Sequence, residues 1–192
     1  DTGLQHIAAE AADRGLWFKP EHPRCLRIQV RDDAALVDGI NAFHNPFQSV
    51  PADMYDSAFR SRRHASLEQR IAQLRAYDNL APILVEAHQR YQGYECRWTN
   101  WRHVSAELVD ASASIIPAGH LLAIWERMLF DPGENRRGFP DLIALGSKTG
   151  DYCLIEVKGP GDALQDSQKR WLRFFQSQGI PAQVAWVEWC DD

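Results

Sequence analysis

The chain has 192 residues, of which 45% are hydrophobic, and it carries a formal net charge of −5. This length is enough to bury a substantial core, and no apolar run approaches a membrane span, so no membrane partner is expected. The N-terminus shows no basic-then-apolar signal segment and the four cysteines form no Cys-x-x-Cys pair, which argues against a zinc site and favours reduced thiols in a cytoplasmic protein.

The first part of the chain is predicted to be mainly helical. Apolar periodicity indicates helices over residues 4–14, 33–43, 65–76 and 81–92. Residues 25–30 favour a short strand, and 44–57 contain two prolines typical of an irregular loop. We expect a break near residue 110, with a helical part over 1–110 and an α/β core over 111–192 that are not independent domains.

The C-terminal part predicts the order helix, strand, strand, helix, strand. Residues 120–130 have a wide apolar helical face, and the runs 142–145 and 152–157 are short and apolar, as buried strands are. A Gly-Pro-Gly break at 159–161 precedes Asp162, which is expected to cap the next helix. Residues 182–187 favour a further strand.

Charged residues stand at the ends of the two apolar strands. Asp141 opens the first strand, while Glu156 and Lys158 end the second and share one face, because strand side chains alternate. Two carboxylates can hold a hard divalent cation, and a nearby lysine can orient water or offset charge. This spacing predicts a metal-dependent phosphodiesterase site. The alternative is a strand-capping Asp141 beside an exposed ion pair, which buried strands disfavour.

Gln168 is a polar residue on the apolar face of the predicted last helix. It lies on the same side as Leu164, Trp171 and Phe175, where its amide must find a partner. A metal-bound water or a scissile phosphate would supply one, and so would a backbone carbonyl.

Three blocks, at residues 138–141, 154–160 and 164–172, resemble the VRR-NUC domain of the PD-(D/E)xK nuclease superfamily. They are most similar to the Fanconi-associated nucleases and their bacterial homologues, with fainter similarity over 46–63. The resemblance implies an α/β, restriction-endonuclease-like core, a mixed sheet flanked by helices, with an N-terminal helical part. It also implies a structure-selective DNA nuclease that cuts 5′ flaps and trims DNA from a 5′ end in repair, including interstrand-crosslink processing.

The resemblance also implies site residues. Asp141, Glu156 and the Val157 carbonyl would bind Mg²⁺ or Mn²⁺, Lys158 would be the active-site lysine, and Gln168 would lie beside the site.

The family has one further metal-binding glutamate upstream. Its separation from Asp141 points to Glu21, although the sequence after Glu21 resembles a turn and a strand where the family has a helix. Glu10, in the first predicted helix, is the alternative.

The expected partner is DNA with flaps or branched ends, in the bacterial cytoplasm at the nucleoid or in a eukaryotic nucleus. The net charge of −5 is unusual for a DNA-binding protein. Local basic clusters or N-terminal DNA-binding segments absent from this chain would resolve the conflict. The basic clusters are Arg60, Arg62, Arg63 and His64; Arg136 and Arg137; and Lys169, Arg170 and Arg173.

Two other functions remain open for the same core. A Holliday-junction resolvase or a restriction-type endonuclease would cut DNA as a dimer with two spaced sites. A non-catalytic module would bind branched DNA only, and such modules typically lack one of the three site residues Asp141, Glu156 and Lys158, all of which are present here.

Overall fold

The computed structural model describes residues 17–19, 51–93 and 101–188, and the structural statements below concern these residues. The predicted helices over 4–14 and 33–43, the strand over 25–30, and both Glu10 and Glu21 lie outside them. The described helices are α4 (Phe59–Arg62), α5 (His64–Leu74), α6 (Ala81–Tyr91), α7 (Ala106–Ile115), α8 (Ala118–Phe130), α9 (Pro132–Asn135) and α10 (Asp166–Gln178).

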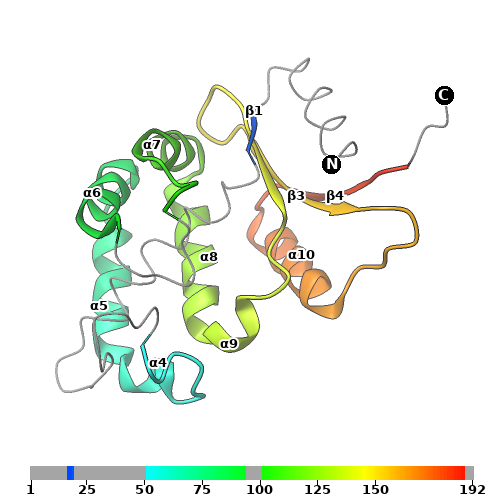
Figure 1. Cartoon of the computed structure of the whole chain (residues 1–192). Coiled ribbons are helices and arrows are strands. Elements are labelled where there is room, and N and C mark those ends of the chain that lie inside the picture. The colour runs from blue at the N-terminus through cyan, green and yellow to red at the C-terminus, as the bar shows by residue number, and fades with distance from the viewer. Residues whose placement is uncertain (1–16, 20–50, 94–100, 189–192) are drawn as a thin grey trace.

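Four strands form one mixed sheet in the order β1-β2-β3-β4. They are β1 (Trp17–Lys19), β2 (Leu142–Leu145), β3 (Tyr152–Lys158) and β4 (Ala182–Trp186). β2 runs antiparallel to both β1 and β3, whereas β3 and β4 are parallel and are joined through α10. This arrangement confirms the expected α/β class, a mixed sheet flanked by helices (Figure 1).

Helix α8 connects the helical layer to the sheet. Figure 1 shows it between α5 on one side and the sheet with α10 on the other. Its residues Leu121, Ile124 and Trp125 are buried, and one apolar cluster extends through the helices and the sheet from Met54 to Ile180. The proposed boundary near residue 110 stays a prediction.

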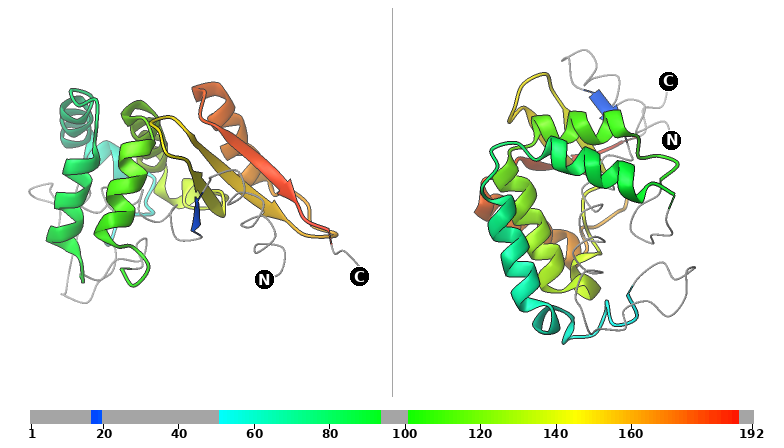
Figure 2. Two further views of the ribbon diagram at one scale, coloured as in Figure 1. Left: turned by 90° about the horizontal axis from the view of Figure 1, so that it is seen from above. Right: turned by 90° about the vertical axis from the view of Figure 1, so that its left-hand side faces the viewer.

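The two faces of the sheet have separate apolar clusters. Ile143 and Leu154 belong to the main core, whereas Leu142 and Ile155 belong to a second cluster on the opposite face. Figure 2 shows α10 along one face of the sheet. Because side chains alternate along a strand, Glu156 and Lys158 share the face of Leu154, the face that carries the main core and α10.

Most predicted elements are confirmed with small changes at their ends. Helices α5 and α6 match the predictions over 65–76 and 81–92, and β2 has the predicted bounds. The predicted cap at Asp162 is wrong: Gln165 is the N-cap of α10, and the Asp162 carboxylate accepts from the Gly159 N–H at 2.9 Å. Asp162 therefore stabilises the turn before the helix.

Three described helices, α4, α7 and α9, had no specific prediction. Helix α9 is one turn long, begins at Pro132, and is capped by Asp131, whose carboxylate accepts from the Glu134 N–H at 3.0 Å. One turn is too short to show a periodic apolar pattern.

No described helix by itself is long and apolar enough to cross a membrane; α7 and α8 meet that criterion only together, with a bend of 109° between them.

Candidate active site

The register of β2 and β3 brings the two acids of the predicted site together. Leu142 pairs with Ile155, so one step further along the ladder Asp141 lies opposite Glu156. Directly opposed residues on antiparallel strands have neighbouring side chains on the same face. The Asp141 carboxylate also accepts from the Val157 N–H at 3.0 Å. The sheet thus holds Asp141 against the end of β3.

Glu156 is a buried carboxylate beside a buried lysine. The exposed fraction is 2% for Glu156 and 7% for Lys158, and Lys158 Nζ lies 2.8 Å from Glu156 Oε1. Burial raises the pKa of Glu156 above its ordinary value; the negative charge of Asp141 acts in the same direction, and the Lys158 ammonium opposes both. Glu156 therefore gives up its proton less readily than an exposed glutamate does.

Gln168 joins α10 to the acid on β3. Its Nε2 donates to Glu156 Oε1 in a short contact, and its Oε1 accepts from the Gln165 N–H at 2.8 Å. The partner of the amide is therefore a carboxylate of the site and not a backbone carbonyl. One side chain completes the capping box of α10 and orients Glu156.

The Val157 carbonyl, predicted as a further metal ligand, is on the same side of β3 as Asp141. In a parallel ladder, alternate residues bond to the same neighbour, and the Lys158 carbonyl accepts from the Val187 N–H just after β4. The backbone groups of Val157 therefore point away from β4, toward the side where its N–H bonds to Asp141.

These residues fit a hard divalent cation. Two carboxylates approach closely enough that Asp141 raises the pKa of Glu156, and carboxylate and carbonyl oxygens are the ligands that Mg²⁺ and Mn²⁺ prefer. Among the described residues, no three or more His, Cys, Asp and Glu side chains are placed so that they could hold a metal ion together. A third carboxylate would have to come from elsewhere, and Glu21, the expected candidate, lies outside the described part of the chain.

The segment that leads into Asp141 is fastened to α10. Trp171 Nε1 donates to the carbonyls of Asn135 at 3.2 Å and Arg137 at 3.0 Å. Gly138 has a φ of +75°, and a Cβ there would lie 2.6 Å from the backbone nitrogen of Gln168. Sequence reasoning placed Trp171 only in an apolar stripe. The available signal was its indole N–H, which needs an acceptor when it is buried.

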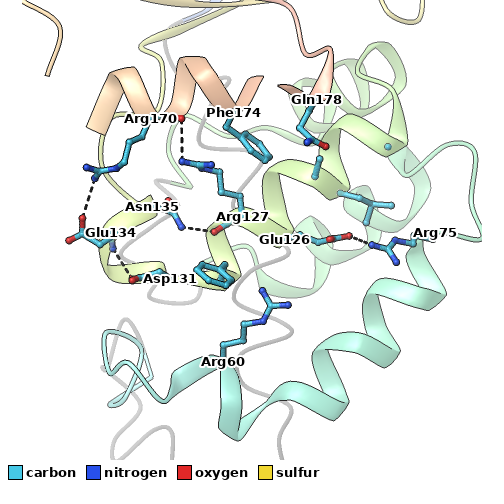
Figure 3. Close-up of a pocket in the computed structure, with 14 residues that line it drawn as sticks. Arg60, Arg75, Glu126, Arg127, Asp131, Glu134, Asn135, Arg170, Phe174 and Gln178 are labelled. Carbon is cyan, nitrogen blue, oxygen red and sulfur yellow. Dashed lines mark hydrogen bonds and ion pairs between the residues drawn. The ribbon is translucent and has the colours of Figure 1, made fainter. Parts of the chain in front are cut away.

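A cleft of about 700 Å³ lies beside α8 and α10 (Figure 3), and Asp141, Glu156 and Lys158 are not among the residues that line it. Arg170 lines it and is two positions from Gln168, a rotation of about 200° around a helix. The charged residues that line the cleft are largely paired: Arg75 with Glu126 at 2.6 Å, and Arg170 with Glu134 at 3.1 Å. The cleft therefore does not contain the acids of the predicted site.

The basic cluster at residues 60–64 differs from the DNA-contacting surface that the sequence suggested. The Arg63 side chain is fully buried and donates from both terminal nitrogens to Asp53, each at 2.8 Å. Its guanidinium lies 4.2 Å from the centre of the Phe59 ring. The expectation that Arg63 contacts phosphate is wrong, because it has no exposed surface; the half-exposed Arg62 pairs with Asp53 and Asp56.

Comparison with known proteins gives a consistent result. Residues 75–189 match the family model of the VRR-NUC domain. The chain is 38% identical over 148 residues to a Fanconi-associated nuclease 1 homolog of Pseudomonas aeruginosa, covering 77% of this chain and 26% of the relative. It is 28% identical over 191 residues to Fanconi-associated nuclease 1 of Danio rerio, covering 97% of this chain and 19% of the relative.

A solved structure is also similar over nearly the whole chain. It is the crystal structure of paFAN1 bound to 2nt 5′ flap DNA with gap, with a TM-score of 0.85 and 31% identity. The match covers 98% of this chain and 35% of that one. This chain therefore spans about a third or less of the relatives it matches.

Proposed function

Because this chain belongs to the VRR-NUC family, we propose that it is a metal-dependent, structure-selective DNA nuclease that acts on flaps or branched ends during repair, including repair of interstrand crosslinks. The observation that carries the proposal is that Asp141, Glu156 and Lys158 converge where β2 begins and β3 ends. A buried, paired acid with a raised pKa is typical of a functional site.

The residues divide the work of phosphodiester hydrolysis. Asp141, Glu156 and the Val157 carbonyl would hold Mg²⁺ or Mn²⁺. Such an ion supplies Lewis acidity, which offsets the charge of the phosphate and makes water a better nucleophile at neutral pH. Gln168 keeps Glu156 in one orientation through its amide hydrogen bond.

Lys158 contributes a positive charge that solvent does not screen. Its Nζ lies 2.8 Å from Glu156, in a largely buried position. A preorganised cation at this position stabilises the negative charge that develops on a phosphate under attack, and it can also donate a hydrogen bond to the attacking water.

The cell compartment follows from the substrate: we expect the nucleoid of a bacterium or the nucleus of a eukaryote.

The substrate class rests on the relatives. The similar solved structures hold 5′ flap DNA with a gap, with flaps of two and one nucleotides. We therefore propose 5′ flaps in preference to four-way junctions. This chain spans about a third of those structures. The preference for 5′ flaps is therefore proposed for this chain, and so is its ability to bind the duplex.

The test compares wild type with Asp141→Asn on 5′-flap, four-way-junction and plain duplex DNA, in Mn²⁺ and in EDTA. Wild type should cut the flap substrate in Mn²⁺ and cut nothing in EDTA. Asp141→Asn should lower the cleavage rate by more than about 100-fold, because even the partners of metal ligands are worth about 10- to 100-fold. Flap binding, measured by fluorescence anisotropy, should be unchanged.

The alternatives give different results in the same experiment. Preferred cleavage of the four-way junction would indicate a resolvase. Binding without cleavage by wild type, in either Mg²⁺ or Mn²⁺, would indicate a non-catalytic module. Full activity of Asp141→Asn would remove this acid from the site.

A further inference from the structure

Asp141 reaches the site on a segment without regular structure. Helix α9 ends at Asn135 and β2 begins at Leu142, so the intervening residues have no ladder of their own to fix them. Asp141 itself is exposed, and its carboxylate bonds to the Val157 N–H. The sheet holds Asp141 from its C-terminal side, and what holds the chain just upstream determines how firmly it stays opposite Glu156.

The start of this segment is tied to two helices through Asn135. Its side-chain amide donates to the Arg127 carbonyl in α8 at 2.7 Å, and its own carbonyl accepts from the Trp171 indole in α10. Figure 3 shows the contact between Asn135 and Arg127, next to the ion pair of Arg170 with Glu134. One residue thus connects the last turn of α8 to the first half of α10.

Trp171 contacts the next residues as well. Its indole N–H also reaches the Arg137 carbonyl, and its ring meets the edge of Phe139 at a centroid distance of 5.0 Å and an angle of 83°. The Arg127 guanidinium lies 4.8 Å from the ring centre on the side of α8. Trp171 itself is 1% exposed, so its N–H has no water to replace these acceptors.

Helix α10 therefore contacts Glu156 directly and Asp141 only through the segment before it. Gln168 bonds to Glu156, and Trp171, three residues later on the same side of the helix, bonds to the segment that ends in Asp141. We propose that Trp171 is a positioning residue of the metal site: its indole N–H fixes Asp141 relative to Glu156 and so sets the affinity for the cation. This inference rests on the proposed metal site.

The test is the affinity for Mn²⁺, measured by isothermal titration calorimetry on the purified protein without DNA. Trp171→Phe keeps an aromatic ring in the core and removes the N–H donor; it also leaves a smaller ring, a loss of volume that a buried Trp→Phe control shares. We expect its Kd for Mn²⁺ to rise about threefold to tenfold, the change that one lost hydrogen bond produces. Cleavage should return toward the wild-type rate at saturating Mn²⁺, because the chemistry is intact once the ion is bound.

Trp125→Phe is the matched control, since Trp125 is a buried tryptophan of α8 outside the site. It should leave the Kd for Mn²⁺ unchanged even where it lowers the melting temperature. An unchanged Kd in Trp171→Phe would overturn the inference while leaving the metal site in place. Absence of Mn²⁺ binding by wild type would overturn the proposed function and this inference together.

A second variant covers the case in which Trp171→Phe does not fold. Asn135→Ala removes the half-buried amide that ties the segment to Arg127 and leaves the core unaltered. Its Kd for Mn²⁺ should rise in the same direction as that of Trp171→Phe. A wild-type Kd in Asn135→Ala would then overturn the inference.

Discussion

At the scale of single residues, Glu156 has two conflicting requirements. It must lose its proton to bind a cation, yet its burial raises its pKa and Asp141 adds a like charge. Lys158 reduces this conflict through its hydrogen bond and its charge. The sequence indicated that Glu156 and Lys158 share a face, because strand alternation alone decides it. It did not indicate that Gln168 bonds to Glu156, since that contact depends on how α10 docks.

The first prediction concerns pH. Protons compete with Mn²⁺ for Glu156, so Mn²⁺ affinity should fall as the pH drops through the raised pKa of this residue. Lys158→Met removes the group that lowers this pKa, so the loss of affinity should begin at a higher pH than in wild type. Titration calorimetry across a pH series measures both curves. Lys148→Met, at an exposed turn, is the control, and superimposable curves for Lys158→Met and wild type would contradict the prediction.

The second prediction separates two neighbouring arginines. Arg63→Met should lower the free energy of unfolding by about 3 kcal/mol, because it leaves Asp53 without its bidentate, largely buried partner. Arg62→Gln, at a half-exposed position, should leave the urea concentration at the midpoint of unfolding close to that of wild type. Urea denaturation measures both. Equal midpoints for the two variants would mean that Arg63 is not structural.

At the scale of elements, short-range patterns predicted β2, β3 and β4 well, missed β1 and misplaced the start of α10. The bounds of β2 follow from a continuous apolar run between turn residues. The cap of α10 was misplaced because Asp is a favoured N-cap residue and Gln is not, whereas in the structure Asp162 bonds the Gly159 N–H and Gln165 is the N-cap. Such a choice depends on the path of the turn, which local sequence does not specify.

The third prediction tests the contact of the segment before β2 with α10. Gly138→Ala places a methyl group 2.5 Å from the backbone of Ser167 at a φ of +75°, so both the backbone strain and the clash act against it. We expect a loss of about 3 kcal/mol in the free energy of unfolding, together with weaker cleavage. Gly150→Ala has a similar φ of +86° but open space around it, and should cost about 1 kcal/mol. Equal losses in the two variants would show that close approach to α10 does not matter.

At the scale of the whole molecule, the net charge of −5 does not say where positive charge lies on the surface. Basic residues expected to grip DNA are engaged in ion pairs, such as Arg60 with Glu68 and Lys169 with Asp166. Exposed pairs of this kind are weak, so phosphate can replace the carboxylates. The composition showed that a negative net charge conflicts with DNA binding. It could not show which basic residues are paired with acids of distant elements, as Arg170 is with Glu134, because such pairs depend on the fold.

The last prediction concerns the stability of the molecule with and without its cation. Asp141→Asn removes the like charge beside Glu156 and keeps an oxygen that can accept from the Val157 N–H. In EDTA this variant should therefore melt at or above the wild-type temperature. In Mn²⁺ at about 100 times its Kd, wild type should gain about 2.7 kcal/mol from binding to the folded state alone, and Asp141→Asn should gain nothing. Differential scanning fluorimetry measures this, with the exposed Asp110→Asn as a control that should respond as wild type does. An equal gain in Asp141→Asn would mean that Mn²⁺ stabilises the protein from another site, because a neutral carboxamide oxygen attracts the cation much less than a carboxylate does.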